Sequence, residues 1–135
     1  NLFEFLRPKI GGKIILVFGS AGERDKQKRA EMGRMADQYA DLIILTREDN
    51  RSEEITQICQ QIASGITRKK LDQEYYILPD RREAMRFALT KAQKKDIVVI
   101  TGKGHEQSLN IDGQEIAWDD PKVLKEELRT LRNTN

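Results

Sequence analysis

The chain has 135 residues, of which 38% are hydrophobic and 34% are charged, and its formal net charge is +2. This length predicts one domain, residues 1–135, with a heavily charged exterior, and a charge so near zero argues against nucleic acid as a partner. One cysteine and one histidine exclude an internal disulfide and a Cys/His zinc set, so no metal site is predicted. Since no apolar run approaches the roughly 20 residues that span a bilayer, we expect a cytoplasmic protein with no membrane contact.

Short β-branched runs alternate with amphipathic stretches, which is typical of βαβ units on a parallel sheet. Strands are predicted at residues 13–18, 42–45, 75–78 and 96–101. Helices are predicted to begin at Lys26, at Ser52 and after Asp80, with Glu83 completing a capping box. The side chains expected to face the core from these helices recur three or four residues apart: Met32, Met35, Ala36 and Tyr39; Ile55, Ile58, Cys59 and Ile62; Met85, Ala88, Leu89 and Ala92.

The last part of the sequence departs from this alternation. Asp112-Gly113 lies at the centre of residues 109–118 and predicts a two-residue antiparallel hairpin. Asp120 and Pro121 are expected to cap and start a final helix. Its expected inward side chains are Val123, Leu124, Leu128 and Leu131. The fold predicted is therefore α/β, Rossmann-like, with a mostly parallel sheet, helices on both faces and a C-terminal antiparallel hairpin.

Three polar loops follow predicted strands, at residues 19–25, 46–51 and 102–106. The carboxyl ends of parallel strands meet at one edge of a sheet, so Arg24, Arg51, Lys103, His105 and Glu106 are expected near one pocket. Arginine suits a carboxylate and glutamate suits an ammonium, which predicts a site for a zwitterion. Taken singly, each residue also fits a surface ion pair. Neither glycine-containing loop completes a dinucleotide or P-loop motif, which argues against NAD or an autonomous ATP site.

Several motifs in register are more specific than this pattern. They are residues 17–29 followed by Met32-Gly33, Ala40-Asp41, Thr46, Pro79-Asp80-Arg81, the Gly-Lys-Gly-His-Glu of residues 102–106, and Trp118-Asp119-Asp120. From about Ile10 to Leu128 the sequence resembles the C-terminal, amino-acid-binding domain of Mur-type peptidoglycan ligases, closest to the muramyl tripeptide synthetases.

The resemblance implies a three-domain, ATP-dependent ligase that adds a third amino acid, diaminopimelate-like or lysine, to UDP-N-acetylmuramoyl-L-alanyl-D-glutamate through an acyl phosphate. ATP and Mg²⁺ would be bound mainly by a central ATPase domain of the same polypeptide, absent from this chain, so the isolated domain is expected to be inactive and to hold no catalytic residue. The positions implied to bind the amino acid are Arg24, Glu48, Asp49, Asn50, Arg51, Gly102 and Glu106, with Asp25, Lys26, Lys103 and His105 as secondary candidates.

Two departures from the family pattern carry expectations of their own. The selectivity motif of the family is commonly Asp-Asn-Pro-Arg, whereas residues 48–51 read Glu-Asp-Asn-Arg. Arg51 is retained, which favours a diaminopimelate-like substrate. The strand that usually opens the domain is missing, and the resulting open sheet edge predicts a strand-swapped or edge-paired homodimer.

Two other functions are alternatives. One is a stand-alone α/β module that binds a ligand or a protein, which the same three loops fit. The other is the C-terminal domain of a folylpolyglutamate synthase-like ligase, which shares the architecture, although the Glu-Arg-Asp-Lys of residues 23–26 and the Gly-Lys-Gly-His-Glu of residues 102–106 argue against it.

Overall fold

The computed structural model describes residues 1–134, except for the side chain of Thr134. In chain order the elements are α1 (Leu2–Leu6), a 3-10 turn (Arg7–Lys9), β1 (Ile14–Phe18), α2 (Lys26–Tyr39), β2 (Leu42–Leu45), α3 (Ile55–Ala63), β3 (Tyr75–Ile77), α4 (Arg81–Lys91), β4 (Ile97–Ile100), β5 (Ser108–Ile111), β6 (Gln114–Ala117) and α5 (Asp120–Thr134). Each predicted strand is confirmed to within one residue at either end.

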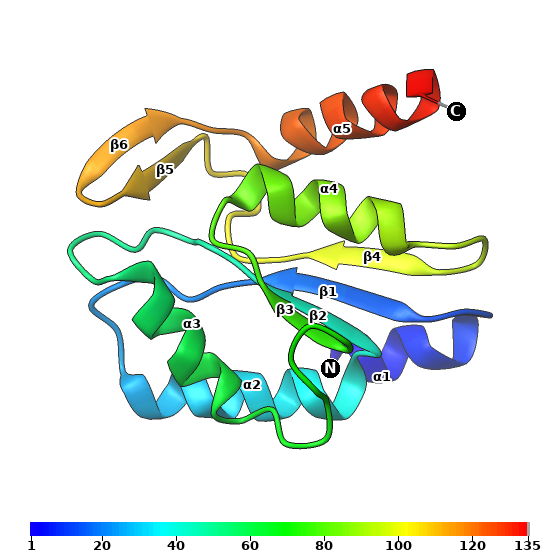
Figure 1. The fold of residues 1–135 in the computed structure, drawn as a ribbon, viewed down its shortest axis with the longest axis horizontal. Helices are drawn as coiled ribbons and strands as arrows, with labels where there is room; N and C mark the ends of the chain where they lie inside the picture. Colours follow the sequence, from blue (N-terminus) through cyan, green and yellow to red (C-terminus); the bar gives the residue numbers. More distant parts are fainter. Residues whose placement is uncertain (135) are drawn as a thin grey trace.

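The main sheet has the strand order β3-β2-β1-β4, and its neighbouring strands are parallel. Helices α2 and α3 cover one face and α4 covers the other, with α5 packed on the outside of α4 (Figure 1). All five residues of β1 are buried because this central strand packs against helices on both faces. Ile14, Leu16 and Phe18 face α2 and α3, whereas Ile15 and Val17 face α4. The predicted fold class is confirmed.

The predicted hairpin is also confirmed. Strands β5 and β6 pair antiparallel, and the turn between them places Asp112 at φ 54° and Gly113 at φ 93°. Both positive angles match the two-residue turn that follows the natural twist of a hairpin. Figure 1 shows this hairpin beyond the carboxyl ends of the sheet strands, next to the loops that follow β1 and β2.

One predicted face of α2 is wrong in part. Met35 is 51% exposed, whereas Arg29, Gly33 and Asp37 are buried. The reason is that α2 crosses α3 closely at Gly33. A Cβ added to Gly33 would lie 1.9 Å from the Ile62 carbonyl oxygen. The glycine face therefore turns toward α3, and Met35 turns away from the core. By contrast, the predicted stripe of α3 is confirmed, with Cys59 fully buried.

At two predicted helix starts the capping residue differs from the expected one. Helix α3 begins at Ile55 and is capped by Glu54, not by Ser52. The Glu54 carboxylate accepts from the backbone N–H groups of Thr56 and Gln57. At the start of α5 the carboxylate of Asp119 accepts from the Lys122 N–H, while the carboxylate of Asp120 faces the interior. The cap at Asp80 is confirmed by its bond to the Glu83 N–H.

The inner face of α5 also differs from the expected stripe. Val123 is buried as predicted, but Leu128 is 38% exposed and Glu127 is buried in its place. Arg82 and Arg86 on α4 both bind the Glu127 carboxylate, at 2.9 and 2.5 Å. These ion pairs hold Glu127 against α4 and turn Leu128 toward the surface.

Among the helices of residues 1–134, none has both the length and the apolar character that crossing a membrane would need.

Candidate functional site

The candidate site lies at the point where the order of the strands across the sheet reverses. From β1 the chain proceeds outward to β2 and β3, then crosses back to β4 on the other side of β1. Open α/β sheets bind ligands in the crevice at the carboxyl ends of strands next to such a switch point. The loops after β1, β2 and β4 all open on this edge (Figure 1).

Arg29 joins the first two of these loops. Its guanidinium is fully buried and donates to Ser20 Oγ at 3.3 Å, to the Ala21 carbonyl at 2.8 Å and to both Glu53 carboxylate oxygens at 2.9 Å. The hydrogen bond from Arg29 chiefly holds the pKa of Glu53 at about 2, far below its usual range. Because Glu53 also accepts from the backbone N–H of Glu23, the loop that carries Arg24 is tied to the segment leading into α3.

Arg81, at the start of α4, connects the other elements of the edge. Its guanidinium is buried and binds both Asp120 carboxylate oxygens, at 2.9 and 2.7 Å. It also donates to the carbonyl of Arg47 at 2.8 Å and to that of Thr101 at 3.1 Å. Trp118 donates its indole N–H to Asp120 as well, at 2.6 Å. One side chain thus holds the ends of β2, β4 and α5 together.

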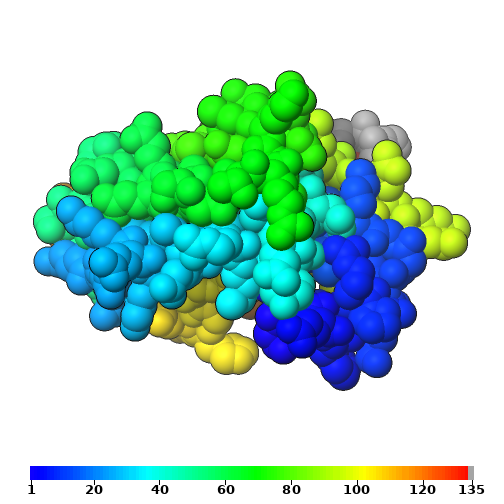
Figure 2. Space-filling model, turned by 90° about the horizontal axis from the view of Figure 1, so that it is seen from below, coloured from blue at the N-terminus to red at the C-terminus, as the bar shows by residue number. Residues whose placement is uncertain are grey.

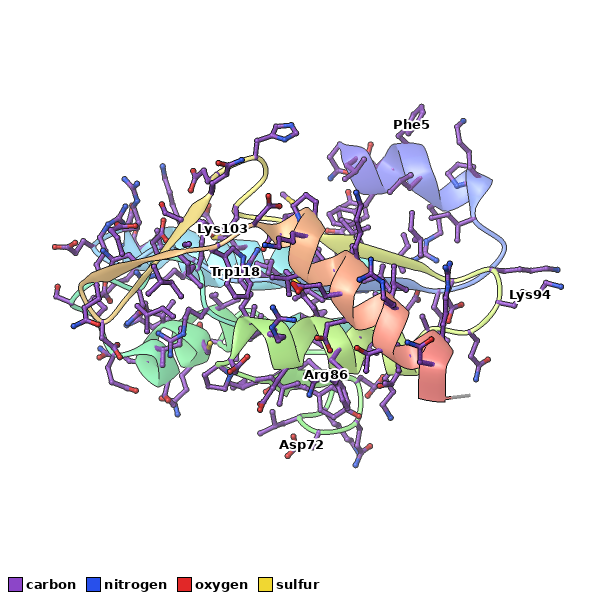
Figure 3. The ribbon with its side chains drawn as sticks, turned by 90° about the horizontal axis from the view of Figure 1, so that it is seen from above. Phe5, Asp72, Arg86, Lys94, Lys103 and Trp118 are labelled. Atoms are coloured by element: carbon purple, nitrogen blue, oxygen red, sulfur yellow. The ribbon has the colours of Figure 1, made fainter. Side chains whose placement is uncertain are left out.

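Lys103 connects the loop after β4 to the loop after β2. Its side chain is 1% exposed, and Nζ lies 2.9 Å from each Asp49 carboxylate oxygen and 2.6 Å from Glu106 Oε2. Burial alone lowers the pKa of this ammonium, but the hydrogen bonds to Asp49 and Glu106 outweigh burial and raise the pKa above its ordinary value. Figure 3 shows Lys103 within the molecule near the hairpin, in contrast to Phe5, which points away from it.

The loops that carry Arg24, Arg51 and Glu106 are therefore in direct or relayed contact. The Gly22 N–H donates to the Asp49 carbonyl at 2.6 Å, and Arg51 Nη1 donates to the Gly22 carbonyl at 3.0 Å. Arg24 is exposed, as are His105 and Glu106, whose side chain is 61% exposed. These side chains are accessible from solvent at the edge where the loops meet.

Other predicted site residues are engaged within the protein. Asn50 is fully buried, and Asp49 binds Lys103 and the Asn110 N–H. Asp25 caps α2 by accepting from the Gln27 N–H, and Lys26 begins that helix as an exposed residue. The sequence motif alone does not separate these engaged residues from the exposed ones, because all of them stand in the same short loops.

Glu48 differs from its neighbours because its carboxylate accepts no hydrogen bond from residues 1–134. The side chain lies against Gly102, whose φ is +114°, and a Cβ there would come within 2.7 Å of Glu48 Oε2. Burial chiefly raises the pKa of Glu48 to about 7; the charges of Asp49 and Glu106 raise it further, while those of Arg81 and Lys103 oppose the change. Gly102 thus leaves room for a carboxyl group that titrates near neutrality.

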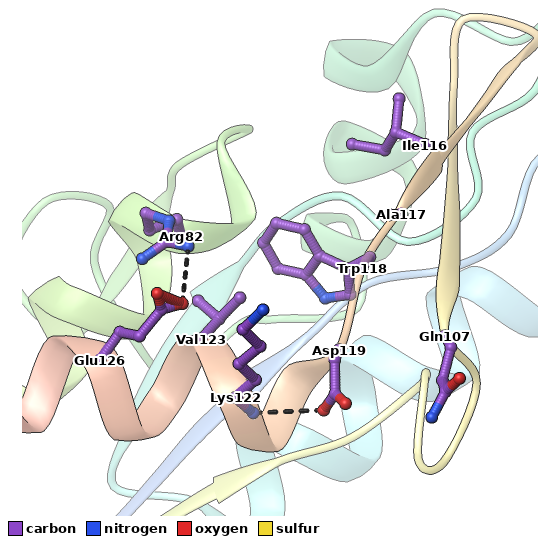
Figure 4. A pocket seen from close by; sticks show the side chains of 9 residues that line it. All are labelled: Arg82, Gln107, Ile116, Ala117, Trp118, Asp119, Lys122, Val123 and Glu126. Carbon is purple, nitrogen blue, oxygen red and sulfur yellow. Dashed lines mark hydrogen bonds and ion pairs between the residues drawn. The ribbon is translucent and has the colours of Figure 1, made fainter.

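The structure also contains hollows that the sequence did not predict. One of about 470 Å³ is lined by Arg82, Trp118, Lys122 and Glu126, among others, between the hairpin and α5 (Figure 4). An apolar one of about 320 Å³ lies between α1 and α2, which are side by side on the face in Figure 2. The Trp118-Asp119-Asp120 motif borders the first hollow, whereas the second is lined by residues of α1, β1 and α2 together with Thr101. Within residues 1–134 no group of three or more acidic, cysteine or histidine side chains is arranged to hold a metal ion.

An open parallel sheet with charged loops at its switch point defines a domain of the open α/β class, in which ligands commonly bind at this edge. The sequence matches the family described as "Mur ligase, glutamate ligase domain" over residues 1–104. The chain belongs to this family.

Individual relatives are similar over nearly the whole chain. A UDP-N-acetylmuramoyl-L-alanyl-D-glutamate–2,6-diaminopimelate ligase of Caldanaerobacter subterraneus is 45% identical, over 93% of this chain and 26% of that protein. A UDP-N-acetylmuramyl-tripeptide synthetase of Borreliella afzelii is 40% identical, over 97% of this chain and 26% of that protein. The solved structure of a UDP-N-acetylmuramoyl-L-alanyl-D-glutamate–2,6-diaminopimelate ligase aligns with a TM-score of 0.89 at 33% identity, covering 97% of this chain and 26% of that one. The chain thus spans about a quarter of the length of these relatives.

The buried arginine network yields a stability prediction. Replacing Arg81 with Met keeps apolar volume but leaves the Asp120 carboxylate buried without its cation, so we expect the free energy of unfolding to fall by about 3 to 5 kcal/mol. Urea denaturation of the chain measures this loss. The matched control is Arg7→Met, because the Arg7 and Asp41 side chains are 44% and 39% exposed and their ion pair should contribute at most about 1 kcal/mol. Equal losses in the two variants would contradict the prediction.

Proposed function

We propose that this chain is a single domain, the C-terminal amino-acid-binding domain of an ATP-dependent ligase that adds the third amino acid to UDP-N-acetylmuramoyl-L-alanyl-D-glutamate. The names of the similar proteins support this activity. The observation that carries the binding role is the charged rim, where Lys103 draws Asp49 and Glu106 together and exposed groups of both signs remain. By itself the domain would be inactive, because none of its residues is assigned to the chemical step.

In the proposed site, one set of side chains binds the carboxylate of the amino acid and another set binds its ammonium group. Arg24 and Arg51 would bind carboxylate, since a guanidinium offers five N–H donors. Among residues 1–134, Arg51 directs one nitrogen to a protein acceptor, the Gly22 carbonyl. Glu106 and Glu48 would accept hydrogen bonds from an ammonium, and the backbone of Gly102 would contact the ligand between them. Lys26 and His105, exposed at the same rim, remain secondary candidates.

The two arginines favour an amino acid with a carboxylate at each end. A diaminopimelate-like substrate has a second carboxylate that one guanidinium would bind, whereas lysine would place an ammonium near Arg51 and be repelled. We therefore propose a diaminopimelate-like third residue.

The proposed reaction requires ATP and Mg²⁺, but the glycine-containing loop after β1, residues 19–25, does not fit a phosphate group. The backbone N–H groups of Gly22 and Glu23 already donate to Asp49 and Glu53, so they are not available to phosphate oxygens. We propose that a central ATPase domain of the same polypeptide binds both and docks on this rim together with the UDP-muramoyl dipeptide. Since ATP and a UDP-linked precursor are both substrates, we propose that the reaction takes place in the cytoplasm.

Arg51 provides the direct test of the amino-acid site. In the complete ligase, Arg51→Ala should raise the KM for the amino acid by about 10- to 100-fold through loss of a charge-assisted carboxylate contact, with a much smaller change in the KM for ATP. Steady-state phosphate release measures both constants. Arg68→Ala is the control, since Arg68 lies on the segment after α3, outside the proposed site. Its side chain is 69% exposed and pairs with Asp37 of α2. Equal increases in both constants for Arg51→Ala would count against the assignment.

Glu48 predicts a pH dependence for the same site. If its ionised carboxylate binds the ammonium, lowering the pH through about 7 protonates Glu48 and weakens binding, so the KM for the amino acid should rise as the pH falls from 8 to 6. Glu48→Gln removes this titration and should give a KM that is higher at pH 8 and nearly independent of pH. A variant that keeps the pH profile of the parent would refute the role of Glu48.

A second proposal concerns self-association of this chain. No strand among residues 1–134 pairs with the outer edge of β4, and an unpaired strand edge favours pairing with another chain. We propose a homodimer, strand-swapped or paired edge to edge through β4. Sedimentation velocity should show a dimer whose fraction grows with concentration, and a monomer at the highest concentrations tested would rule the dimer out.

A further inference from the structure

The loop that carries Arg51 holds a conformation that its own sequence does not favour. Arg51 has φ 53°, in the left-handed region that residues with a Cβ rarely adopt. Such a conformation persists only where surrounding contacts determine it. The contacts that hold this loop therefore decide where the Arg51 guanidinium lies.

Asn50, immediately before Arg51, makes four of these contacts with a fully buried side chain. Its Oδ1 accepts from Arg47 Nη1 at 2.6 Å and from the Asp112 N–H at 3.3 Å. Its Nδ2 donates to the Glu53 carbonyl at 2.8 Å and to Asp112 Oδ1 at 2.8 Å. Half of these bonds join the loop to the tip of the hairpin, 62 residues further along the chain.

A second connection lies one residue earlier in the loop. Asp49 Oδ1 accepts from the Asn110 N–H at 2.8 Å, on the strand that leads into the hairpin turn. The same carboxylate binds Lys103, which in turn holds Glu106. The hairpin therefore contacts both residues that precede Arg51 and is linked to the carboxylate on the other side of the site.

Few side chains of the hairpin strands are buried. All four residues of β6 are exposed, and Leu109 is the one buried residue of β5. A two-stranded hairpin is at best marginally stable in water without a surface to pack against. Its contacts with the loop thus fix both partners at once.

We propose that the hairpin β5–β6 is a latch that positions the amino-acid-binding loop, with Asp112 and Asn50 as its closing contact. This proposal rests on the proposed function, and it assigns Asn50 and Asp112 as positioning residues that do not touch the substrate. Docking of the hairpin tip holds Arg51 in its left-handed conformation, and release of the tip lets the loop relax and the guanidinium move away from the carboxylate that it binds.

Asp112→Gly in the complete ligase opens the latch with the least change. Glycine adopts the positive φ of this turn position, so the hairpin turn is retained while the side chain that binds Asn50 is lost. We expect the KM for the amino acid to rise by roughly 3- to 10-fold, with kcat and the KM for ATP changed by less than about twofold. Asp112→Asn restores the behaviour of the parent, because its amide oxygen still accepts from Asn50 and asparagine tolerates the left-handed region.

Glu115→Ala is the matched control within the same hairpin. Glu115 accepts from Asn110 Nδ2 at 3.0 Å and, within residues 1–134, forms no hydrogen bond or ion pair with residues 46–51, so this variant perturbs the hairpin without opening the latch. Amide hydrogen exchange across residues 47–53 gives a readout that does not depend on catalysis. Exchange there should quicken in Asp112→Gly and remain at the level of the parent in Asp112→Asn and Glu115→Ala.

The outcomes separate the latch from the function on which it rests. Unchanged exchange and unchanged KM in Asp112→Gly would overturn the latch, as would equal effects of Asp112→Gly and Glu115→Ala. A normal KM for the amino acid in Arg51→Ala would overturn the proposed function, while the exchange data would still decide whether the hairpin holds the loop.

Discussion

Three buried cations, Arg29, Arg81 and Lys103, form the constraint on which the functional edge depends. A charge removed from water is tolerated only when carboxylates and carbonyls surround it, and each of these side chains gathers its partners from loops that are distant in sequence. The loops cannot move apart without leaving a buried charge unpaired. The edge of the sheet is therefore assembled by residues that are themselves hidden from any ligand.

This arrangement separates residues that hold the site from residues available to a ligand. Lys103, Asp49 and Asn50 direct their polar atoms inward, whereas Arg24 and Glu106 remain exposed. Glu48 falls between the two groups, since it is partly buried yet accepts no hydrogen bond from the residues described, which is why its pKa lies near 7. An incoming ammonium would supply the partner that the protein itself does not.

The sequence predicts the strands, the hairpin and the loops between them well, because each depends on local patterns of apolar, turn and capping residues. It fails where a long-range ion pair competes with a local preference. Ser52 is a good cap in isolation, but Glu53 next to it is bound by Arg29 and α3 is capped by Glu54. On α5, two arginines bind Glu127, which is buried where Leu128 was expected. Met35 fails for a related reason, since the close approach at Gly33 sets the rotation of α2.

For the site, sequence motifs give the position of the loops but not the direction of each side chain. Within residues 102–106, Gly102 makes space for Glu48, Lys103 is a buried crosslink, and Glu106 is held by that crosslink with most of its surface exposed. Residues 48–51 show the same mixture, and Asn50, which stands where the resembling family commonly has proline, supports the loop through side-chain hydrogen bonds to Arg47, Glu53 and Asp112. A proline would restrict the backbone but offer the hairpin no hydrogen bond. Asn50 therefore gives the loop a connection to the hairpin tip that a proline side chain at this position cannot make.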